Sequence, residues 1–196
     1  MKKSFIVIFF LLNFVSGYSQ SFNLSMGLGI SSQLRKTYPE QGTSLLPLWT
    51  INGRFGRDFR ILKNLYWRAE ISYYQEGILY DSTMYSELFH YLSFDNFLLF
   101  RSYRSPVYFG IGGYGSRLMA LSATINGQTL SLPVREYNPW DYGVMPLFGL
   151  VLDFDFISYY MEARYRFGLN DIYIPSDNYI KNRGFEFNVG VSLRIH

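Results

Sequence analysis

Hydrophobic and polar residues alternate along most of this chain with a period of two. Phe22, Leu24, Met26, Leu28 and Ile30 are apolar, and the residues between them are polar or glycine. This period indicates a β-strand, because successive side chains point to opposite faces. The pattern returns after each polar stretch and predicts eight strands: one from Phe22, then Leu45–Phe59, Leu65–Glu76, Phe89–Arg101, Val107–Leu118, Tyr142–Phe156, Tyr159–Leu169, and one from Gly184 onward.

The connections between these strands alternate between short and long. Three are short turns, at Arg60–Asn64, Ser102–Pro106 and Ile157–Ser158. Four are longer and are expected on the opposite side, at Gln33–Ser44, Gly77–Leu88, Met119–Asp141 and Asn170–Arg183. Tilted strands of about ten residues can cross a bilayer, and short turns opposite long loops are typical of outer-membrane barrels. The prediction is an all-β fold, an eight-stranded antiparallel up-and-down transmembrane β-barrel.

The apolar faces are expected to point outward, toward lipid. Aromatic residues make up 20% of the chain, with 18 Tyr and 18 Phe, and the interior of an eight-stranded barrel could not hold so many rings. The hydrophobic fraction is 48% while the mean hydropathy is close to zero, which alternation produces and a helical bundle does not. Two aromatic girdles are expected: Trp49, Tyr73 and Tyr142 near the long loops, and Phe59, Trp67, Phe100 and Tyr159 near the short turns.

The opposite faces carry charges, which would line the lumen. Alternate residues of a strand share one face, and this strand parity predicts six inward basic residues: Arg54, Arg68, Arg101, Arg164, Arg166 and Arg194. We expect six inward acidic residues to face them, Glu70, Glu76, Asp95, Asp153, Glu162 and Glu186. An ionised group away from water is tolerated only when it is paired. The balanced set therefore predicts a structural salt-bridge plug, whereas on a soluble sheet the same residues would be solvated surface charges.

The first residues resemble a secretory signal peptide. Lys2 and Lys3 precede the apolar run Phe5–Val15, and Gly17 and Ser19 are small residues suited to a cleavage site. The alternative, a transmembrane anchor, needs about 20 apolar residues, and this run is shorter. We therefore expect a signal peptide over 1–19, a barrel domain over 20–196, and export to the outer membrane of a Gram-negative bacterium.

Candidate chemistry is sparse. The chain has no cysteine, which excludes disulfides, cysteine metal sites and a lipoprotein anchor. The net charge is +3, but two lysines belong to the leader, so a nucleic-acid partner is not expected. Of the two histidines, His90 has Ser86 and Glu87 close in sequence and His196 ends the chain. Neighbouring strand residues point to opposite faces, so we expect no catalytic site at His90. Two distant histidines without cysteines form no metal-binding cluster, so we expect no metal site, and no cofactor is expected.

The longest connection, Met119–Asp141, is unusually apolar for an exposed tether. It contains Leu130, Leu132, Val134, Tyr137 and Trp140, which could form a partner surface or pack over the barrel mouth.

The favoured function is that of a non-enzymatic, monomeric barrel in outer-membrane lipid. It would act through its loops as an envelope anchor, an adhesin or an accessory subunit of an outer-membrane complex, such as a secretion system. The alternative is a binder or transporter of a small hydrophobic ligand or lipid in the lumen.

Several segments resemble a known group. They are the leader ending in Ser19 and Gln20, and the segments Tyr91–Phe94, Val107–Gly112 and Glu162–Gly168, together with the alternating final strand. On these residues the chain resembles the small outer-membrane β-barrel proteins of Bacteroidetes, the PorT-like and OmpA-barrel-like group. The resemblance implies the fold and the location, and it implies no catalytic residues. The chain departs from the group at Asp95-Asn96, where an apolar residue and Pro are usual, and at its end, which is not aromatic.

Overall fold

The computed structural model describes residues 20–35, 45–80, 85–102, 104–134, 137–174 and 180–195. The expected leader, His196 and the connections at 36–44 and 175–179 lie outside these ranges. The described residues form nine strands, β1 (Gln20–Arg35), β2 (Leu45–Leu62), β3 (Leu65–Tyr80), β4 (Tyr85–Arg101), β5 (Val107–Ile125), β6 (Gln128–Leu132), β7 (Trp140–Asp153), β8 (Ile157–Gly168) and β9 (Ile180–Ile195). None of the described segments is a helix long and apolar enough to cross a membrane.

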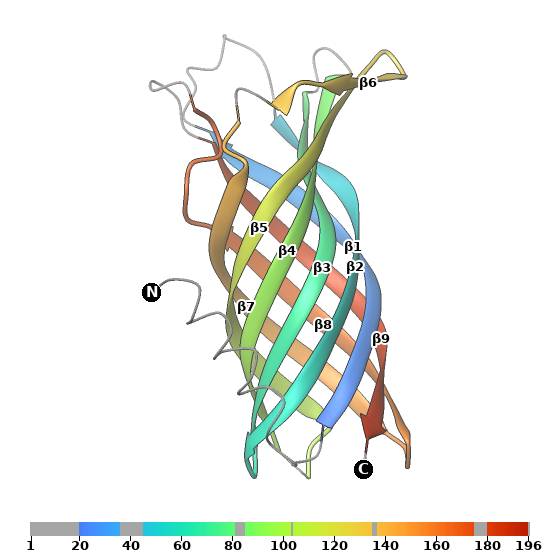
Figure 1. Cartoon of the computed structure of the whole chain (residues 1–196). Helices are drawn as coiled ribbons and strands as arrows, with labels where there is room; N and C mark the ends of the chain where they lie inside the picture. Colours follow the sequence, from blue (N-terminus) through green and yellow to red (C-terminus); the bar gives the residue numbers. More distant parts are fainter. Residues whose placement is uncertain are drawn as a thin grey trace.

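Eight of the strands close into a barrel, which confirms the predicted fold class (Figure 1). The order is β4-β3-β2-β1-β9-β8-β7-β5, and β4 pairs with β5 to close the ring. The first and last strands pair antiparallel from Gln20 opposite Ile195 to Arg35 opposite Ile180. Closure leaves no sheet edge in the wall, so backbone groups hydrogen-bond between strands all the way round.

The two ends of the barrel differ. One end, called here the turn end, carries the short connections after β2, β4 and β7 and is the lower end in Figure 1. The opposite end, called here the loop end, carries the connections after β1, β3, β5 and β8. Strands reach further toward the loop end than the sequence indicates, since β3 runs to Tyr80 and pairs there with Tyr85 of β4. The prediction of a loop over Gly77–Leu88 was therefore wrong, because the consecutive apolar residues Ile78, Leu79 and Tyr80 occupy both faces and obscure the alternation.

The predicted loop Met119–Asp141 also contains a hairpin. Strand β5 continues to Ile125, and β6 returns beside it from Gln128. Asn126 and Gly127 connect them with φ angles of 49° and 81°, the left-handed pair of a two-residue hairpin turn. The Asn-Gly dipeptide is the sequence signal that could have located this hairpin.

The turn expected at Ile157–Ser158 was also wrong. Strand β8 begins at Ile157, and the turn lies at 154–156. Exposed Phe154 and Phe156 extend the apolar pattern there, which made the preceding strand look longer than it is.

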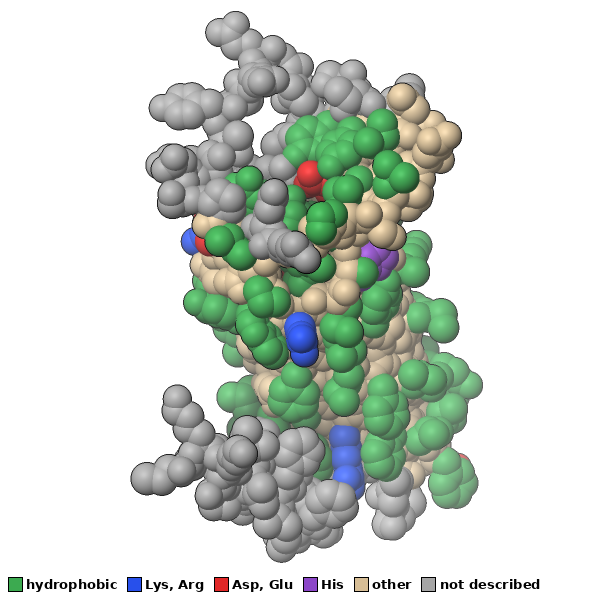
Figure 2. Space-filling view, turned by 45° about the horizontal axis from the view of Figure 1, so that its top comes forward, with side chains coloured by type: hydrophobic (Ala, Val, Ile, Leu, Met, Phe, Trp, Pro, Cys, Tyr) green, Lys and Arg blue, Asp and Glu red, His purple; other side chains and the backbone are tan. Residues whose placement is uncertain are grey.

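The outer wall is apolar and the interior is polar, the reverse of a soluble protein. Exposed Leu, Ile, Val, Met and Phe side chains cover the wall in Figure 2, with few basic groups among them. Asn96, which interrupts the apolar face of β4, accepts a hydrogen bond from the Trp67 indole nitrogen at 3.2 Å. Of the expected girdle residues, Trp49 and Tyr142 are exposed, but Phe59 is buried because the Trp67 ring stacks on it at 5.2 Å.

Inward glycines lie directly opposite large inward side chains of the neighbouring strand. Gly149 faces Tyr108, Gly190 faces Tyr160, and Gly112 faces Phe97. A Cβ atom at Gly149 would overlap the Tyr108 ring. The ring has little freedom to move, because its hydroxyl donates to Glu162 Oε1 at 2.5 Å. The glycines therefore make room for rings that fill the narrow lumen.

We expect Gly149→Ala to lower the free energy of unfolding by about 1–3 kcal/mol, because the new methyl group overpacks the Tyr108 ring. The matched control is Gly115→Ala, where a Cβ would meet nothing within 4 Å. Its effect should stay within about 0.5 kcal/mol. Urea unfolding of both variants in detergent micelles is the measurement, and equal midpoints would contradict the packing explanation.

Candidate functional site

The barrel interior contains a dense set of buried charged groups. The buried basic residues in the described part of the chain are Arg54, Arg68, Arg164 and Arg166. The buried acidic residues there are Asp58, Glu70, Glu76, Glu87, Asp95, Asp141, Glu162 and Glu186. The expected balance of six against six was therefore wrong. Three of the expected residues lie at the turn-end mouth, while Asp58, Glu87 and Asp141 were overlooked.

The first charged layer joins β2, β3 and β8. Arg164 Nη1 and Nη2 hydrogen-bond both oxygens of Glu70, at 2.6 and 3.0 Å, and Arg164 Nε donates to Glu162 Oε2 at 2.9 Å. Arg68 pairs with the other oxygen of Glu162 and donates to both oxygens of Asp58, at 2.6 and 2.9 Å. Such forked guanidinium–carboxylate contacts fix geometry as well as charge. The layer ties together strands on opposite sides of the ring.

The second layer lies nearer the loop end and contains Arg54, Arg166 and Glu186. Both arginines pair with Glu186, Arg166 at 3.3 Å from Nη2 to Oε1. The Arg166 guanidinium also lies 3.6 Å from the Tyr74 ring centroid and 4.3 Å from that of Tyr114. Aromatic faces attract a desolvated cation. Arg166 is thus held by rings as much as by carboxylates.

Neutral side chains donate hydrogen bonds to two carboxylates that have no close arginine. Ser72 and Ser93 donate to the two oxygens of Asp95, at 2.8 and 2.5 Å. Asp141 Oδ2 accepts from Tyr114 at 3.2 Å and from Asn182 at 2.9 Å. These hydroxyl and amide groups explain how the interior holds twice as many acidic as basic residues. Asp58 and Asp141 follow the inward parity of their strands, so a stricter count along each strand would have found them.

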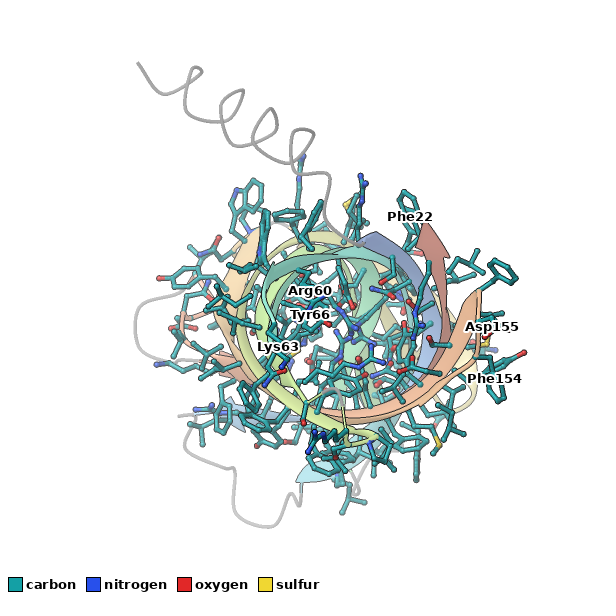
Figure 3. All side chains as sticks on the ribbon, turned by 90° about the horizontal axis from the view of Figure 1, so that it is seen from below. Phe22, Arg60, Lys63, Tyr66, Phe154 and Asp155 are labelled. Carbon is teal, nitrogen blue, oxygen red and sulfur yellow. The ribbon has the colours of Figure 1, made fainter. Side chains whose placement is uncertain are left out.

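The turn-end mouth is open and polar. Asp153 pairs there with both Arg101 and Arg194, and these three side chains are only partly buried. They line a cavity of about 500 Å³ together with Asp58, Tyr66 and other residues. A second, much smaller cavity of about 20 Å³ lies beside Arg68, with room for roughly one water molecule. Figure 3, viewed from the turn end, shows side chains filling the ring, with Arg60 and Tyr66 over the mouth.

The loop-end mouth is closed by an apolar cap. Phe89, Tyr91, Leu118, Leu121, Ile172 and Ile180 form its buried part, and Leu132, Val134, Tyr137 and Tyr173 pack against it. The Tyr137 ring meets the Phe89 ring edge to face at 5.0 Å. Leu132, Val134 and Tyr137 thus pack over the mouth, whereas Leu130 and Trp140 are 50% and 57% exposed. The predicted apolar loop is divided between a cap and an exposed surface.

The interior is suited to stabilising the barrel and poorly suited to transport. Paired charges occupy two layers, the loop end is capped, and the cavity beside Arg68 has room for roughly one water molecule. Within the described ranges, no three His, Asp or Glu side chains are grouped so that they could hold a metal ion.

Solved structures with similar folds are found among bacterial surface proteins. Neisserial surface protein A (NspA) superposes with a TM-score of 0.51 at 14% identity, over 89% of this chain and 97% of that chain. The outer membrane protein OprG from Pseudomonas aeruginosa superposes with a TM-score of 0.57 at 11% identity, over 90% and 96%. At these identities the likeness concerns the fold. No family model and no curated protein matches the chain, so the resemblance to the PorT-like group of Bacteroidetes stays a prediction.

Proposed function

We propose that this chain is a monomeric barrel embedded in the outer membrane of a Gram-negative bacterium, exported by a signal peptide over 1–19. The apolar wall supports the membrane location, because a soluble protein rarely exposes an apolar surface of this extent. Short turns face the periplasm in such barrels and longer loops face outward. In this orientation the polar turn-end mouth opens to the periplasm, and the apolar cap at the loop end lies at the cell surface.

The protein acts through its loop end, as an envelope anchor, an adhesin or an accessory subunit of a larger complex. The capped loop end and the ion pairs that fill the lumen carry this proposal, because they leave the outer surfaces of the loop end as the places where a partner can bind there. At the loop end β6 is the last strand of its sheet, with β5 as its partner. Exposed Leu130 and Trp140 lie on and near this hairpin. An edge strand with apolar neighbours can bind a partner segment by strand addition.

Carriage of a small hydrophobic ligand through the lumen is not favoured. Such a ligand would have to displace the Arg164–Glu70 and Arg68–Glu162 pairs, and each displaced pair would leave charges without partners. The loop-end surface is therefore the better candidate site.

The proposed orientation predicts which residues an impermeant maleimide reaches on whole cells. The natural chain has no cysteine, so Gln128→Cys in the β5–β6 hairpin introduces a single thiol at an exposed position. It should be labelled on intact cells, and the protein should be recovered in the outer-membrane fraction. Asp155→Cys, in the exposed turn before β8, is the matched control and should be labelled only after lysis. The reverse labelling pattern would invert the orientation.

The proposed partner surface can be tested by photo-crosslinking in native cells. A photoreactive amino acid at position 130 should give a protein adduct of defined mass, because Leu130 belongs to the exposed hairpin. The same group at position 152 is the control, since Leu152 is 59% exposed on the apolar wall, where lipid is expected. Equal yields of protein adduct at both positions, or none at 130, would contradict a loop-end partner.

A further inference from the structure

A line of hydrogen bonds crosses the outside of the barrel over four strands. The Ile51 amide donates to Gln75 Oε1 at 3.2 Å, and Gln75 Nε2 donates to the Tyr73 hydroxyl at 3.2 Å. The Tyr73 hydroxyl lies 2.6 Å from His90 Nδ1, and His90 Nε2 lies 3.2 Å from Ser122 Oγ. A serine, a histidine and an orienting hydroxyl thus stand in one row, on β5, β4 and β3.

A β-bulge places Ser122 in this row. Before the bulge, the inward residues of β5 are even-numbered, as buried Ser116 and Leu118 show; beyond it they are odd-numbered, as Leu121 and Ala123 show. The register passes from Leu118 opposite Tyr91 to Ala120 opposite His90 and skips Met119. Without this extra residue Ser122 would point into the lumen. Bulges are over-represented next to active sites, where they redirect side chains.

The row lies where the wall changes from apolar to polar. On β4 the exposed residues from Phe100 to Leu92 are apolar apart from Asn96, and His90 is the next outward position toward the loop end. This stretch is nine residues long, close to the roughly 9–11 that a tilted strand needs to cross the hydrocarbon. His90 and Ser122 therefore lie at the level of lipid carbonyl and headgroup groups, in a half-buried position on the wall.

The hydrogen bonds suit a serine nucleophile with a histidine base. The backbone contact of Gln75 Oε1 turns its amide nitrogen toward Tyr73, so the Tyr73 hydroxyl is an acceptor in that contact. With its second lone pair it can accept from His90 Nδ1–H, which leaves Nε2 free to take the Ser122 proton. A base oriented by a third group in this way is the recurring arrangement of nucleophilic serine sites. Tyr73 is a positioning residue here.

We propose that Ser122 and His90 hydrolyse carboxylic esters of membrane lipids on the outer wall of the barrel, with Tyr73 positioning the histidine. Ser122 Oγ attacks the ester carbonyl carbon and its proton passes to His90 Nε2. The carbon–alkoxy bond then breaks, and the leaving alcohol takes that proton, which leaves an acyl ester on Ser122. Water attacks the acyl carbon and gives a proton to His90. Ser122 leaves, takes the proton back, and the fatty acid is released.

The proposal departs from the sequence-based expectation of no catalysis. That expectation considered Ser86 and Glu87, which are close to His90 in sequence, whereas the partners of His90 come from the neighbouring strands. It is independent of a partner at the loop end.

Covalent labelling tests the nucleophile directly. Folded protein in detergent is incubated with a fluorophosphonate probe, and the modified peptide is identified by mass spectrometry. We expect the probe on Ser122, and at least about 100-fold slower labelling in His90→Gln, which keeps the serine but removes its base. Ser131→Ala is the matched control, because Ser131 lies directly opposite Ser122 on β6, and it should label as the wild type does. Labelling elsewhere, or equal rates in His90→Gln, would overturn the proposal.

Turnover on lipid tests the substrate class. Fatty acid release is measured from vesicles of a glycerophospholipid and, separately, from vesicles of an acylated glucosamine lipid, since both carry fatty acyl esters. Fatty acid release from one kind of vesicle identifies that lipid as the substrate, whereas no release from either kind overturns the proposed activity. Tyr73→Phe should lower kcat by about tenfold and leave KM unchanged, the effect of one lost hydrogen bond. A heat-dependent shift on SDS gels confirms that each variant is folded, so loss of activity cannot be mistaken for unfolding.

Discussion

Replacing Arg164 by alanine is expected to lower the free energy of unfolding in detergent by about 3–5 kcal/mol, a large part of the stability of a barrel this size. Arg164 is fully buried and hydrogen-bonds both oxygens of Glu70 and one oxygen of Glu162. Its removal leaves the carboxylates of Asp58, Glu70 and Glu162 to share one arginine of this layer, Arg68. The cost comes mainly from this excess of poorly hydrated negative charge, since an intact buried pair contributes little net stability. The urea midpoint in micelles is the measurement.

The matched control is Arg101→Ala at the turn-end mouth. Arg101 also pairs with a carboxylate, Asp153, but both side chains reach solvent, so its loss should cost no more than about 1 kcal/mol. A triple variant, Arg164→Met with Glu70→Gln and Glu162→Gln, should recover much of the stability because it removes all three charges together. If Arg164→Ala and Arg101→Ala had the same midpoint, the interior would be as wet as the mouth.

Purified wild-type protein in a planar lipid bilayer is expected to show no steady open level. The cavity beside Arg68 holds only about 20 Å³, and the ion pairs of the two charged layers cross the lumen. A hydrated ion could pass only if several ion pairs opened together. Current recordings at fixed voltage are the measurement, and steady openings on the nanosiemens scale would show that the lumen is a channel.

A variant with a loosened cap tests whether the cap or the charged layers block ion flow through the lumen. Phe89→Ala combined with Tyr137→Ala removes the edge-to-face contact that closes the loop-end mouth, but it leaves the charged layers intact. We expect this variant, like the wild type, to show no steady open level in current recordings. If it conducted while the wild type did not, the cap would be the seal, and the charges would line a pore.

The eight wall strands and the orientation of their faces can be predicted from the amino-acid pattern alone. Alternation such as that of Phe22 to Ile30 leaves one face apolar, and the number of aromatic rings exceeds what an eight-stranded lumen can hold. These two observations require the apolar faces to point outward, and the exposed wall agrees. The inward charges on β2, β3, β8 and β9 follow from the same parity. Such features depend on neighbours along one strand, which the sequence displays directly.

The contacts between residues on different strands become visible only in the folded barrel. Parity places Arg164 and Glu70 inside, but only the closed ring shows that they bond to each other. Ser122 falls in the loop expected over Met119–Asp141, but it lies on β5, where a bulge at Met119 turns it outward to His90. The physical reason is that register and bulges arise from pairing between strands. One extra residue turns every side chain beyond it to the opposite face, and the sequence of one strand does not specify its register with the neighbouring strand.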